Sequence, residues 1–276
     1  MKKCLLLFVF VLCFIEGYRV GYEEVYDAKC LSLFVNKMNE KAVELGMLNT
    51  TFADPSGLLY ENVGTVDDVM ILLQACVNNK IIMSIWNKDS VIIPIYDNKG
   101  TERLVSMYNT FQSDSISPYK VLGRKTGSDG YIFNLAILIG NNVEEYSAYV
   151  VLNASTEVER LTALRKLCDS SVVVNDRLSI CCEFSGGGKY SLNSQYKIPL
   201  LSLTKLMTVL LALEYEPDLY REVIVKPCDI MRGSGIDIKA GECLTFYDAL
   251  LAILISSSNT CSYAIGRGWG TEINYR

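Results

Sequence analysis

Apolar residues recur every three or four positions along several segments of the chain, the spacing that places them on one face of an α-helix. In residues 30–46 this pattern stops at Gly46, a residue favoured just beyond a helix C-terminus. Residues 65–79 show the same pattern, with Thr65 placed as an N-cap and acidic residues in the first turn. The periodicity also predicts helices over residues 155–169, 202–214 and 244–260.

Shorter apolar runs bounded by turn residues are typical of buried strands. Such runs lie at residues 90–97, 102–110, 131–140, 145–154 and 170–184. A turn is expected around Asn141–Asn142, and residues 185–194, rich in glycine and serine, are interpreted as a loop. Helices mixed with hairpin-like strand runs predict an α+β fold with an antiparallel sheet.

The first residues follow a different pattern. Lys2 and Lys3 precede an apolar run from Cys4 to Ile15, which is shorter than the roughly 20 residues that a membrane-spanning helix needs. A basic start with a short apolar run is typical of an export signal. We therefore predict that residues 1–17 form a signal peptide or membrane anchor and that the protein is exported to the cell envelope or beyond. The alternative is a buried first strand.

Composition narrows the possible functions. The 276 residues are half apolar, which suits one large domain or two small ones, and we interpret residues 18–276 as a single domain. A net charge of −5, with no basic cluster, argues against a nucleic-acid partner. The chain has no histidine, which excludes a Ser-His-Asp triad, a Cys-His dyad and a histidine-liganded zinc site. Any nucleophilic serine therefore needs another base, and lysine is the usual substitute.

The ten cysteines do not form a recognisable framework. Cys4 and Cys13 lie in the predicted leader, and no Cys-x-x-Cys pair exists. Cys181 and Cys182 are adjacent, so on a strand their side chains point to opposite faces. We expect these residues to be small buried hydrophobic groups rather than disulfide partners.

The stretch 202–214 begins with a Ser-x-x-Lys motif. On a helix, residues three apart share a face, so Ser202 and Lys205 can touch, with Ser202 in the first turn. A lysine that is desolvated there can lose its proton and act as the base for the serine. Alone, the motif is weak, because a solvated helix start has the same pattern.

A second motif, Ser-x-Asn, is formed by Ser257 and Asn259 at the end of an apolar helix. A serine there can relay a proton, and the amide can bind a carbonyl group. A polar helix C-terminus with no function would show the same residues.

The third motif is Lys125-Thr126-Gly127, just before the predicted strand 131–140. A lysine and a threonine hydroxyl at a strand edge can hold a carboxylate, and Gly127 leaves room for close approach. The alternative is an ordinary basic turn.

Together the three motifs are the marks of the penicillin-recognising serine enzymes. Sequence around them resembles the D-alanyl-D-alanine carboxypeptidases, notably NSQYKIPLLSLTKLMTVLLALE, RGSGIDIKAGECLTFYDALLAILISSSNTCSYAIG and YNTFQSDSISPYKVLGRKTG. The resemblance extends from about residue 30 to residue 267. It implies a beta-lactamase/transpeptidase-like fold, in which an antiparallel sheet is flanked by helices and a mainly helical region lies beside it.

The order of the motifs departs from that family, in which Lys-Thr-Gly comes last. Here it comes first, so the chain is interpreted as a circular permutation with a Lys-Thr-Gly half, residues 18–169, and a second half, residues 170–276. The old ends of the family would be joined near residues 169–180. Domain termini are often close together, which makes such a joint possible. A misassembled reading frame would produce the same order.

Local departures from the family pattern also occur. Pro199 lies three residues before Ser202 rather than two. Arg124 precedes Lys125 where an apolar residue is common, and Cys261 stands where a small residue usually follows the asparagine. These differences bear on efficiency more than on the fold.

The resemblance implies an acyl-enzyme mechanism without metal or cofactor. Ser202 would attack the D-Ala-D-Ala carbonyl while Lys205 accepts its proton. The backbone N–H of Ser202 and one from the strand of Lys125 would form the oxyanion hole. The substrates would be peptidoglycan stem peptides, and beta-lactams would bind the same site.

The other motif residues would handle the leaving group and the carboxylate. Ser257 would relay a proton to the leaving D-alanine, and Asn259 would orient the substrate or the base. Lys125 and Thr126 would bind the terminal carboxylate, beside Gly127.

Two alternatives remain at this point. A beta-lactamase of the same fold would need fast deacylation, commonly through a further glutamate, for which the sequence near Glu61 offers no convincing match. An inactive relative would only bind cell-wall peptides or a partner. The broken motif order and the changes at Pro199 and Arg124 motivate this second alternative.

Overall fold

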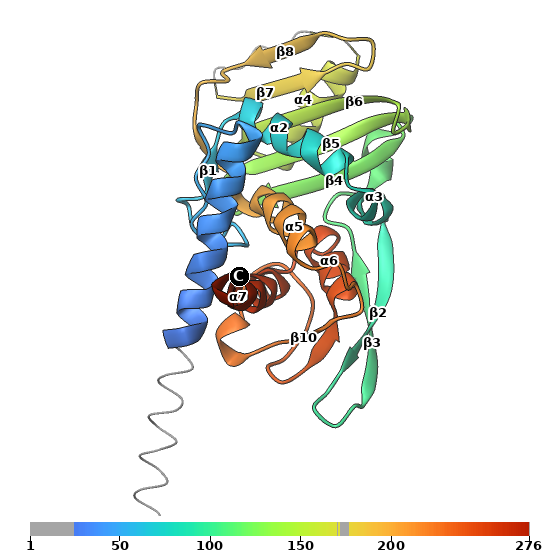
Figure 1. Ribbon diagram of the computed structural model, residues 1–276. Coiled ribbons are helices and arrows are strands. Elements are labelled where there is room, and N and C mark those ends of the chain that lie inside the picture. The colour runs from blue at the N-terminus through green and yellow to red at the C-terminus, as the bar shows by residue number, and fades with distance from the viewer. Residues whose placement is uncertain (1–24, 170, 172–176, 276) are drawn as a thin grey trace, which may run out of the picture.

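The computed structural model describes residues 25–169, 171 and 177–275, with side chains up to Gly270 (Figure 1). The predicted leader, residues 1–17, lies outside the described residues, as does part of the predicted joint at residues 169–180. Mixed helices and antiparallel strands confirm the predicted α+β fold.

The largest of the three sheets among the described residues is five-stranded and antiparallel, in the order β4-β5-β6-β7-β8. Its strands are β4 (Val121–Ser128), β5 (Phe133–Asn142), β6 (Glu145–Ala154), β7 (Ser179–Glu183) and β8 (Lys189–Leu192). The interpretation of residues 185–194 as a loop is wrong for Lys189–Leu192. These residues form a strand because they pair with β7, which a local pattern of glycine and serine does not reveal.

The two faces of this sheet are buried against different helices. Alternate residues such as Ala136 and Val150 join the main core, and their neighbours, such as Ile137 and Val151, join a smaller cluster beneath α4 (Glu157–Cys168). Cys181 belongs to the first cluster and Cys182 to the second, as the strand pattern predicted. Five of the eight described cysteines are buried.

The described residues form six further helices, and Figure 1 shows α2 on one side of the sheet and α4 on the other. They are a first helix over residues 25–45, α2 (Val66–Val77), α3 (Lys80–Trp86), α5 (Thr204–Tyr215), α6 (Phe246–Leu254) and α7 (Asn259–Tyr275). Single 3-10 turns lie at Ser113–Ile116, Leu201–Leu203 and Pro227–Asp229. Thr65 caps α2 by accepting from the backbone N–H of Asp68, as expected.

The prediction of one helix over residues 244–260 is wrong. Helix α6 ends at Leu254, and α7 begins at Asn259. Ser257 lies between them with φ of +61°, a left-handed conformation that cannot continue a right-handed helix. The motif Ser-x-Asn therefore occupies a helix-to-helix corner rather than a helix end.

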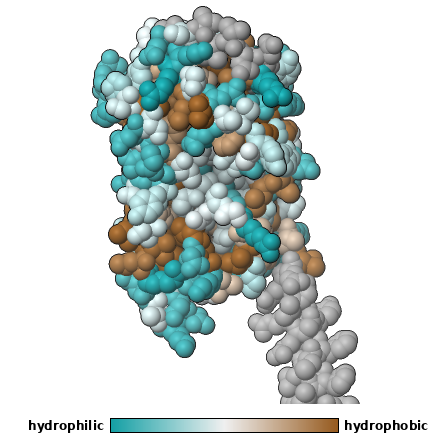
Figure 2. Space-filling model, turned by 180° about the vertical axis from the view of Figure 1, so that it is seen from behind, coloured by the Kyte–Doolittle hydropathy of each residue, from teal (hydrophilic) through white to brown (hydrophobic). Residues whose placement is uncertain are grey.

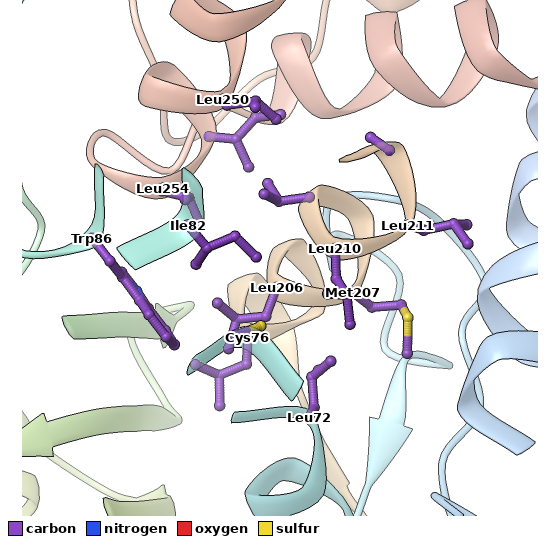
Figure 3. Packing of buried hydrophobic residues seen from close by; sticks show 14 of the residues in the cluster. Leu72, Cys76, Ile82, Trp86, Leu206, Met207, Leu210, Leu211, Leu250 and Leu254 are labelled. Atoms are coloured by element: carbon purple, nitrogen blue, oxygen red, sulfur yellow. The ribbon is translucent and has the colours of Figure 1, made fainter. Parts of the chain in front are cut away.

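Helix α5 passes through the centre of the core. Leu206, Met207, Leu210 and Leu211 belong to one buried cluster with residues of α2, α3 and α6. Those labelled in Figure 3 are Leu72, Cys76, Ile82, Trp86, Leu250 and Leu254. A helix that is apolar on nearly all sides is stable only when it is enclosed in this way. Leu203, Leu206, Met207 and Leu210 are buried, and Leu213 is half-buried.

A four-stranded sheet in the order β10-β11-β2-β3 lies at the lower end of the molecule in Figure 1. Its strands are β10 (Glu222–Ile224), β11 (Cys243–Thr245), β2 (Ser90–Tyr96) and β3 (Glu102–Tyr108), and a small pair joins β1 (Val63–Gly64) to β9 (Ile198–Pro199). The outer faces of β2 and β3 expose Ile92, Leu104 and Tyr108. Figure 2 shows hydrophobic residues gathered above the hydrophilic tip of this hairpin.

Among the described residues, no single helix has the length and hydropathy needed to cross a membrane. Helices α2 and α3, which meet at an angle of 101°, meet that requirement only when they are taken together, by length and composition alone.

Candidate active site

Ser202 lies in the 3-10 turn Leu201–Leu203, immediately before α5. The preceding residue, Leu201, has φ of +52°, which is uncommon for a residue with a side chain. Gly57 permits this turn, because a Cβ atom at Gly57 would lie 1.8 Å from the carbonyl oxygen of Leu201. The strained turn holds Ser202 at the start of α5, where the helix N-terminus favours negative charge.

Lys205 is fully buried one turn after the serine and contacts three oxygen atoms. Its Nζ lies 2.9 Å from Ser202 Oγ, 2.7 Å from the carbonyl oxygen of Ser56 and 2.8 Å from Asn259 Oδ1. Asn259 Nδ2 donates to the carbonyl oxygen of Arg232, which fixes the orientation of the amide. Sequence spacing predicted the contact of Ser202 with Lys205, and the structure brings the two side chains together.

The protonation state of Lys205 follows from this environment. Burial, and next the nearby charge of Lys125, lower the pKa of Lys205 well below its usual value. An uncharged amine has two N–H groups and one lone pair. The two carbonyl-type acceptors, Ser56 O and Asn259 Oδ1, match the two N–H groups. The lone pair is then left for the hydroxyl proton of Ser202, which is the arrangement a general base requires.

Lys125 forms a second serine–lysine contact in the same site. It lies on β4, the edge strand of the five-stranded sheet, and its Nζ is 2.9 Å from Ser257 Oγ and 2.9 Å from the carbonyl oxygen of Thr126. Burial, and next the charge of Arg160, lower the pKa of Lys125 to about 7. A lysine with this pKa exchanges protons readily near neutral pH.

Thr126 and Gly127 bring the edge strand against the serine. Thr126 Oγ1 lies 2.6 Å from Thr110 Oγ1, and both side chains line the pocket. A Cβ atom at Gly127 would lie 3.0 Å from the backbone nitrogen of Ser202 and 2.9 Å from the carbonyl oxygen of Leu200. Gly127 therefore permits β4 to run directly beside Ser202.

These residues surround a pocket of about 150 Å³, lined by Thr110, Thr126, Ser128, Phe133, Glu157, Arg160, Ser202, Ser234 and Ser257. The structure thus brings the seven residues of the three motifs together although their order along the chain is unusual. Sequence reasoning missed the other pocket residues. Among the described residues, no cluster of three or more histidine, cysteine, aspartate or glutamate side chains has the arrangement of a metal site.

Arg160 is the most consequential of the missed residues. Its side chain is 3 % exposed, and its guanidinium forms an ion pair with Glu157 at 2.8 Å and lies over the ring of Phe133 at 5.9 Å. A cation in a pocket wall provides a binding partner for a carboxylate. The sequence does hold a signal for it, because Arg160 lies on the same buried face of α4 as Ala163, Leu164 and Leu167.

Arg124, the unusual residue before Lys125, is also fully buried. Its guanidinium donates to the carbonyl oxygens of Phe111 and Asn87 and contacts Asp89. It therefore anchors β4 to the segment that carries Thr110. A small apolar residue there would leave these carbonyl groups without a donor, which accounts for the arginine in structural terms.

The site combines a serine–lysine pair at a helix start with a second serine and lysine from a facing corner and strand. The model of the D-alanyl-D-alanine carboxypeptidase family matches residues 29–129. Residues 29–129 are thus similar to this family, and the matched part includes Lys125, Thr126 and Gly127. No curated protein and no solved structure matches the chain. Ser202, Lys205, Ser257 and Asn259 lie outside the matched range and are placed in the site by geometry.

The buried lysines predict a dependence of stability on pH. In the unfolded chain Lys125 keeps its proton up to about pH 10.5, whereas in the folded protein its pKa is about 7. Between these values the unfolded state binds more protons, so the free energy of unfolding rises with pH, by up to about 1.4 kcal/mol per unit for each such lysine. Urea unfolding between pH 7 and 8.5 measures this slope.

The control for this prediction is Lys125→Met, which removes one of the two titrating groups and should reduce the slope. The range stops at pH 8.5 because burial raises the pKa of thiols such as those of Cys181 and Cys261. Those groups reverse the trend at higher pH. A free energy of unfolding that stays flat or falls from pH 7 to 8.5 would contradict the assignment of neutral lysines.

Proposed function

We propose that this protein is a serine-type D-Ala-D-Ala carboxypeptidase, which removes the terminal D-alanine from peptidoglycan stem peptides through an acyl-enzyme. The family match supports the general class of serine hydrolase. The observation that carries the specific proposal is the 2.9 Å contact of Lys205 Nζ with Ser202 Oγ, in which the two remaining partners of the amine are both acceptors.

Acylation begins when Lys205 accepts the hydroxyl proton and Ser202 Oγ attacks the carbonyl carbon of the D-Ala-D-Ala bond. The negative charge that develops on the carbonyl oxygen is stabilised by backbone N–H groups, that of Ser202 and one from the end of β4 beside Gly127. The helix N-terminus at Ser202 adds to this stabilisation.

The leaving group is the amine of D-alanine, which needs a proton as the C–N bond breaks. Ser257 donates this proton and receives another from Lys125, whose pKa of about 7 suits a proton donor at neutral pH. Thr126 and Arg160 hold the carboxylate of the departing residue. Transfer of the proton held by Lys205 to the Ser257–Lys125 pair, which lost one to the leaving amine, makes Lys205 neutral again. Water then attacks the acyl-enzyme with Lys205 as the base, and the proton passes to Ser202 Oγ as the shortened peptide is released.

The test combines two measurements on the folded protein. Intact-mass analysis after treatment with a penicillin should show one adduct, and peptide mapping should place it on Ser202. Incubation with a peptide ending in D-Ala-D-Ala should release free D-alanine. If the protein forms no adduct and releases no D-alanine, the proposal is contradicted. Rapid penicillin turnover would instead indicate a beta-lactamase, and peptide binding without release would indicate a non-catalytic relative.

The permuted order of the motifs is part of this proposal. It is supported by the packing of α7 against the first helix, where a Cβ atom at Gly270 would lie 1.8 Å from the carbonyl oxygen of Cys30. A chain with the family order would connect these two neighbouring segments. The tryptic peptide of residues 167–177, found in the protein from its natural source, would show that the two halves are joined in this order. Its absence at full coverage elsewhere would favour a misassembled reading frame.

Action on cell-wall peptides requires export, for which residues 1–17 are the proposed signal or anchor. Fractionation of cells that produce the full chain should place the protein in the envelope or medium. N-terminal sequencing of that material distinguishes a cleaved signal from a retained anchor. Recovery from the cytoplasm alone would contradict this part of the proposal.

A further inference from the structure

The wall of the pocket contains an ion pair that none of the steps above requires. Arg160 Nη2 lies 2.8 Å from Glu157 Oε1, and both residues line the same pocket as Ser202 and Thr126. The two partners differ in environment, because the side chain of Arg160 is 3 % exposed and that of Glu157 is 59 % exposed. A substrate carboxylate that binds Arg160 therefore approaches a cation that already has an anionic partner.

Glu157 is not needed to hold Arg160 in place. The guanidinium also donates to the carbonyl oxygen of Asn134, lies over the ring of Phe133 and is enclosed by the protein. These contacts remain when the carboxylate is removed. A glutamine at position 157 keeps an oxygen acceptor for the guanidinium, so Glu157→Gln should leave the fold intact.

Glu157 is also not needed to start its helix. Thr156 is the N-cap of α4, and it accepts from the backbone N–H of Glu159. Glu159 in turn accepts from both the backbone N–H and the hydroxyl of Ser155. The helix start is thus closed by these other side chains, and the carboxylate of Glu157 is directed to Arg160 and the pocket instead.

We infer that Glu157 is a specificity-determining residue that competes with the substrate carboxylate for Arg160. In the free enzyme it neutralises the buried guanidinium. When an anionic ligand enters, its carboxylate must displace Glu157 or share the guanidinium with it, and the two carboxylates repel each other. The enzyme consequently binds peptide acids less tightly than its pocket cation alone would allow. This inference rests on the proposed function, because it assumes that the pocket takes a peptide carboxylate.

Binding without turnover provides the test. In a Ser202→Ala background, calorimetric titration measures the Kd of a peptide ending in D-Ala-D-Ala and of the same peptide with a C-terminal amide. Adding Glu157→Gln should lower the Kd of the acid three- to ten-fold and change that of the amide less than two-fold. Damage to the fold would weaken both ligands, so tighter binding of the acid alone is specific to the inferred role.

Two controls sharpen this result. Glu144→Gln removes the same charge from the turn after β5, about 30 Å along the strand from the pocket, and should leave both Kd values unchanged. In an Arg160→Gln background, Glu157→Gln should change the Kd of the acid less than 1.5-fold, because the competition needs the guanidinium. A full effect in that background would overturn the inference.

The outcomes separate this inference from the proposed function. An unchanged or higher Kd of the acid in Glu157→Gln would overturn the inference alone. Glu157 would then have no effect on binding, or it would orient Arg160. A tighter acid complex without any D-alanine release from the Ser202 enzyme would support the inference and contradict the carboxypeptidase. If neither the acid nor the amide bound to any variant, both would fail.

Discussion

Replacing Ser202 by alanine is expected to abolish covalent labelling by a penicillin and to reduce D-alanine release by at least about 10³-fold. The substitution removes Ser202 Oγ, which lies 2.9 Å from Lys205 Nζ and is the atom expected to form the acyl bond. It should not unfold the protein, because α5 has no side-chain cap at its start and Ser202 therefore contributes none. Intact-mass analysis and a D-alanine assay measure the two effects, with thermal unfolding as the check on folding.

The matched control is Ser257→Ala, because Ser257 also lies 2.9 Å from a lysine. The two pairs differ in the remaining partners of the amine. Lys205 has two further acceptors and is left with a lone pair for its serine, whereas Lys125 has one further acceptor, the carbonyl oxygen of Thr126. We therefore expect Ser257→Ala to retain the adduct and to lose rate. An adduct that persists in Ser202→Ala and disappears in Ser257→Ala would reverse the two roles.

The spacing of residues along the chain was sufficient to predict contacts between residues that are close in sequence. Ser202 and Lys205 are three apart at the start of an apolar helix, so their contact follows from helix geometry alone. The same holds for the alternation that puts Cys181 and Cys182 on opposite faces of β7. In both cases the partners are close in sequence, and backbone geometry leaves few alternatives.

Contacts between distant segments were harder to predict. Nothing in the sequence near residue 56 shows that its carbonyl oxygen meets Lys205, because that contact depends on Gly57 fitting beneath the turn at Leu201. The pairing of Lys189–Leu192 with β7 was missed for the same reason. Resemblance to a family supplied the convergence of the three motifs, which spacing could not, since they come from three separate parts of the chain.

Charged residues within apolar segments are a further signal in the sequence. Arg124 and Arg160 both lie among apolar residues, where an unpaired charge is strongly disfavoured. Each therefore needs a specific set of acceptors, and each has one: carbonyl groups and Asp89 for Arg124, and Glu157 with Asn134 for Arg160. An arginine on the apolar face of a helix or strand is thus a reason to look for a structural anchor or a ligand at that position.

The second large effect is expected for Lys205→Met, which should reduce the acylation rate by at least about 10³-fold while Ser202 remains in place. Methionine has a similar length and is apolar, so it fits the buried position without a charge. What it removes is the lone pair that accepts the serine proton. Stopped-flow measurement of acylation by a fluorescent penicillin gives the rate, and Lys37→Met, which removes an exposed lysine paired with Glu40, is the matched control.

The pH profile distinguishes loss of the base from loss of structure. In the parent enzyme the acylation rate should rise with pH and then level off once Lys205 is neutral, at a pH well below the usual lysine pKa. In Lys205→Met the residual rate should have no such plateau, because only hydroxide or water is left to remove the proton. A misfolded variant would lose rate at every pH together with its cooperative unfolding transition. If Lys205→Met kept a tenth of the parent rate with the same plateau, Lys205 would not be the base, and Lys125, in contact with Ser257, would become the candidate.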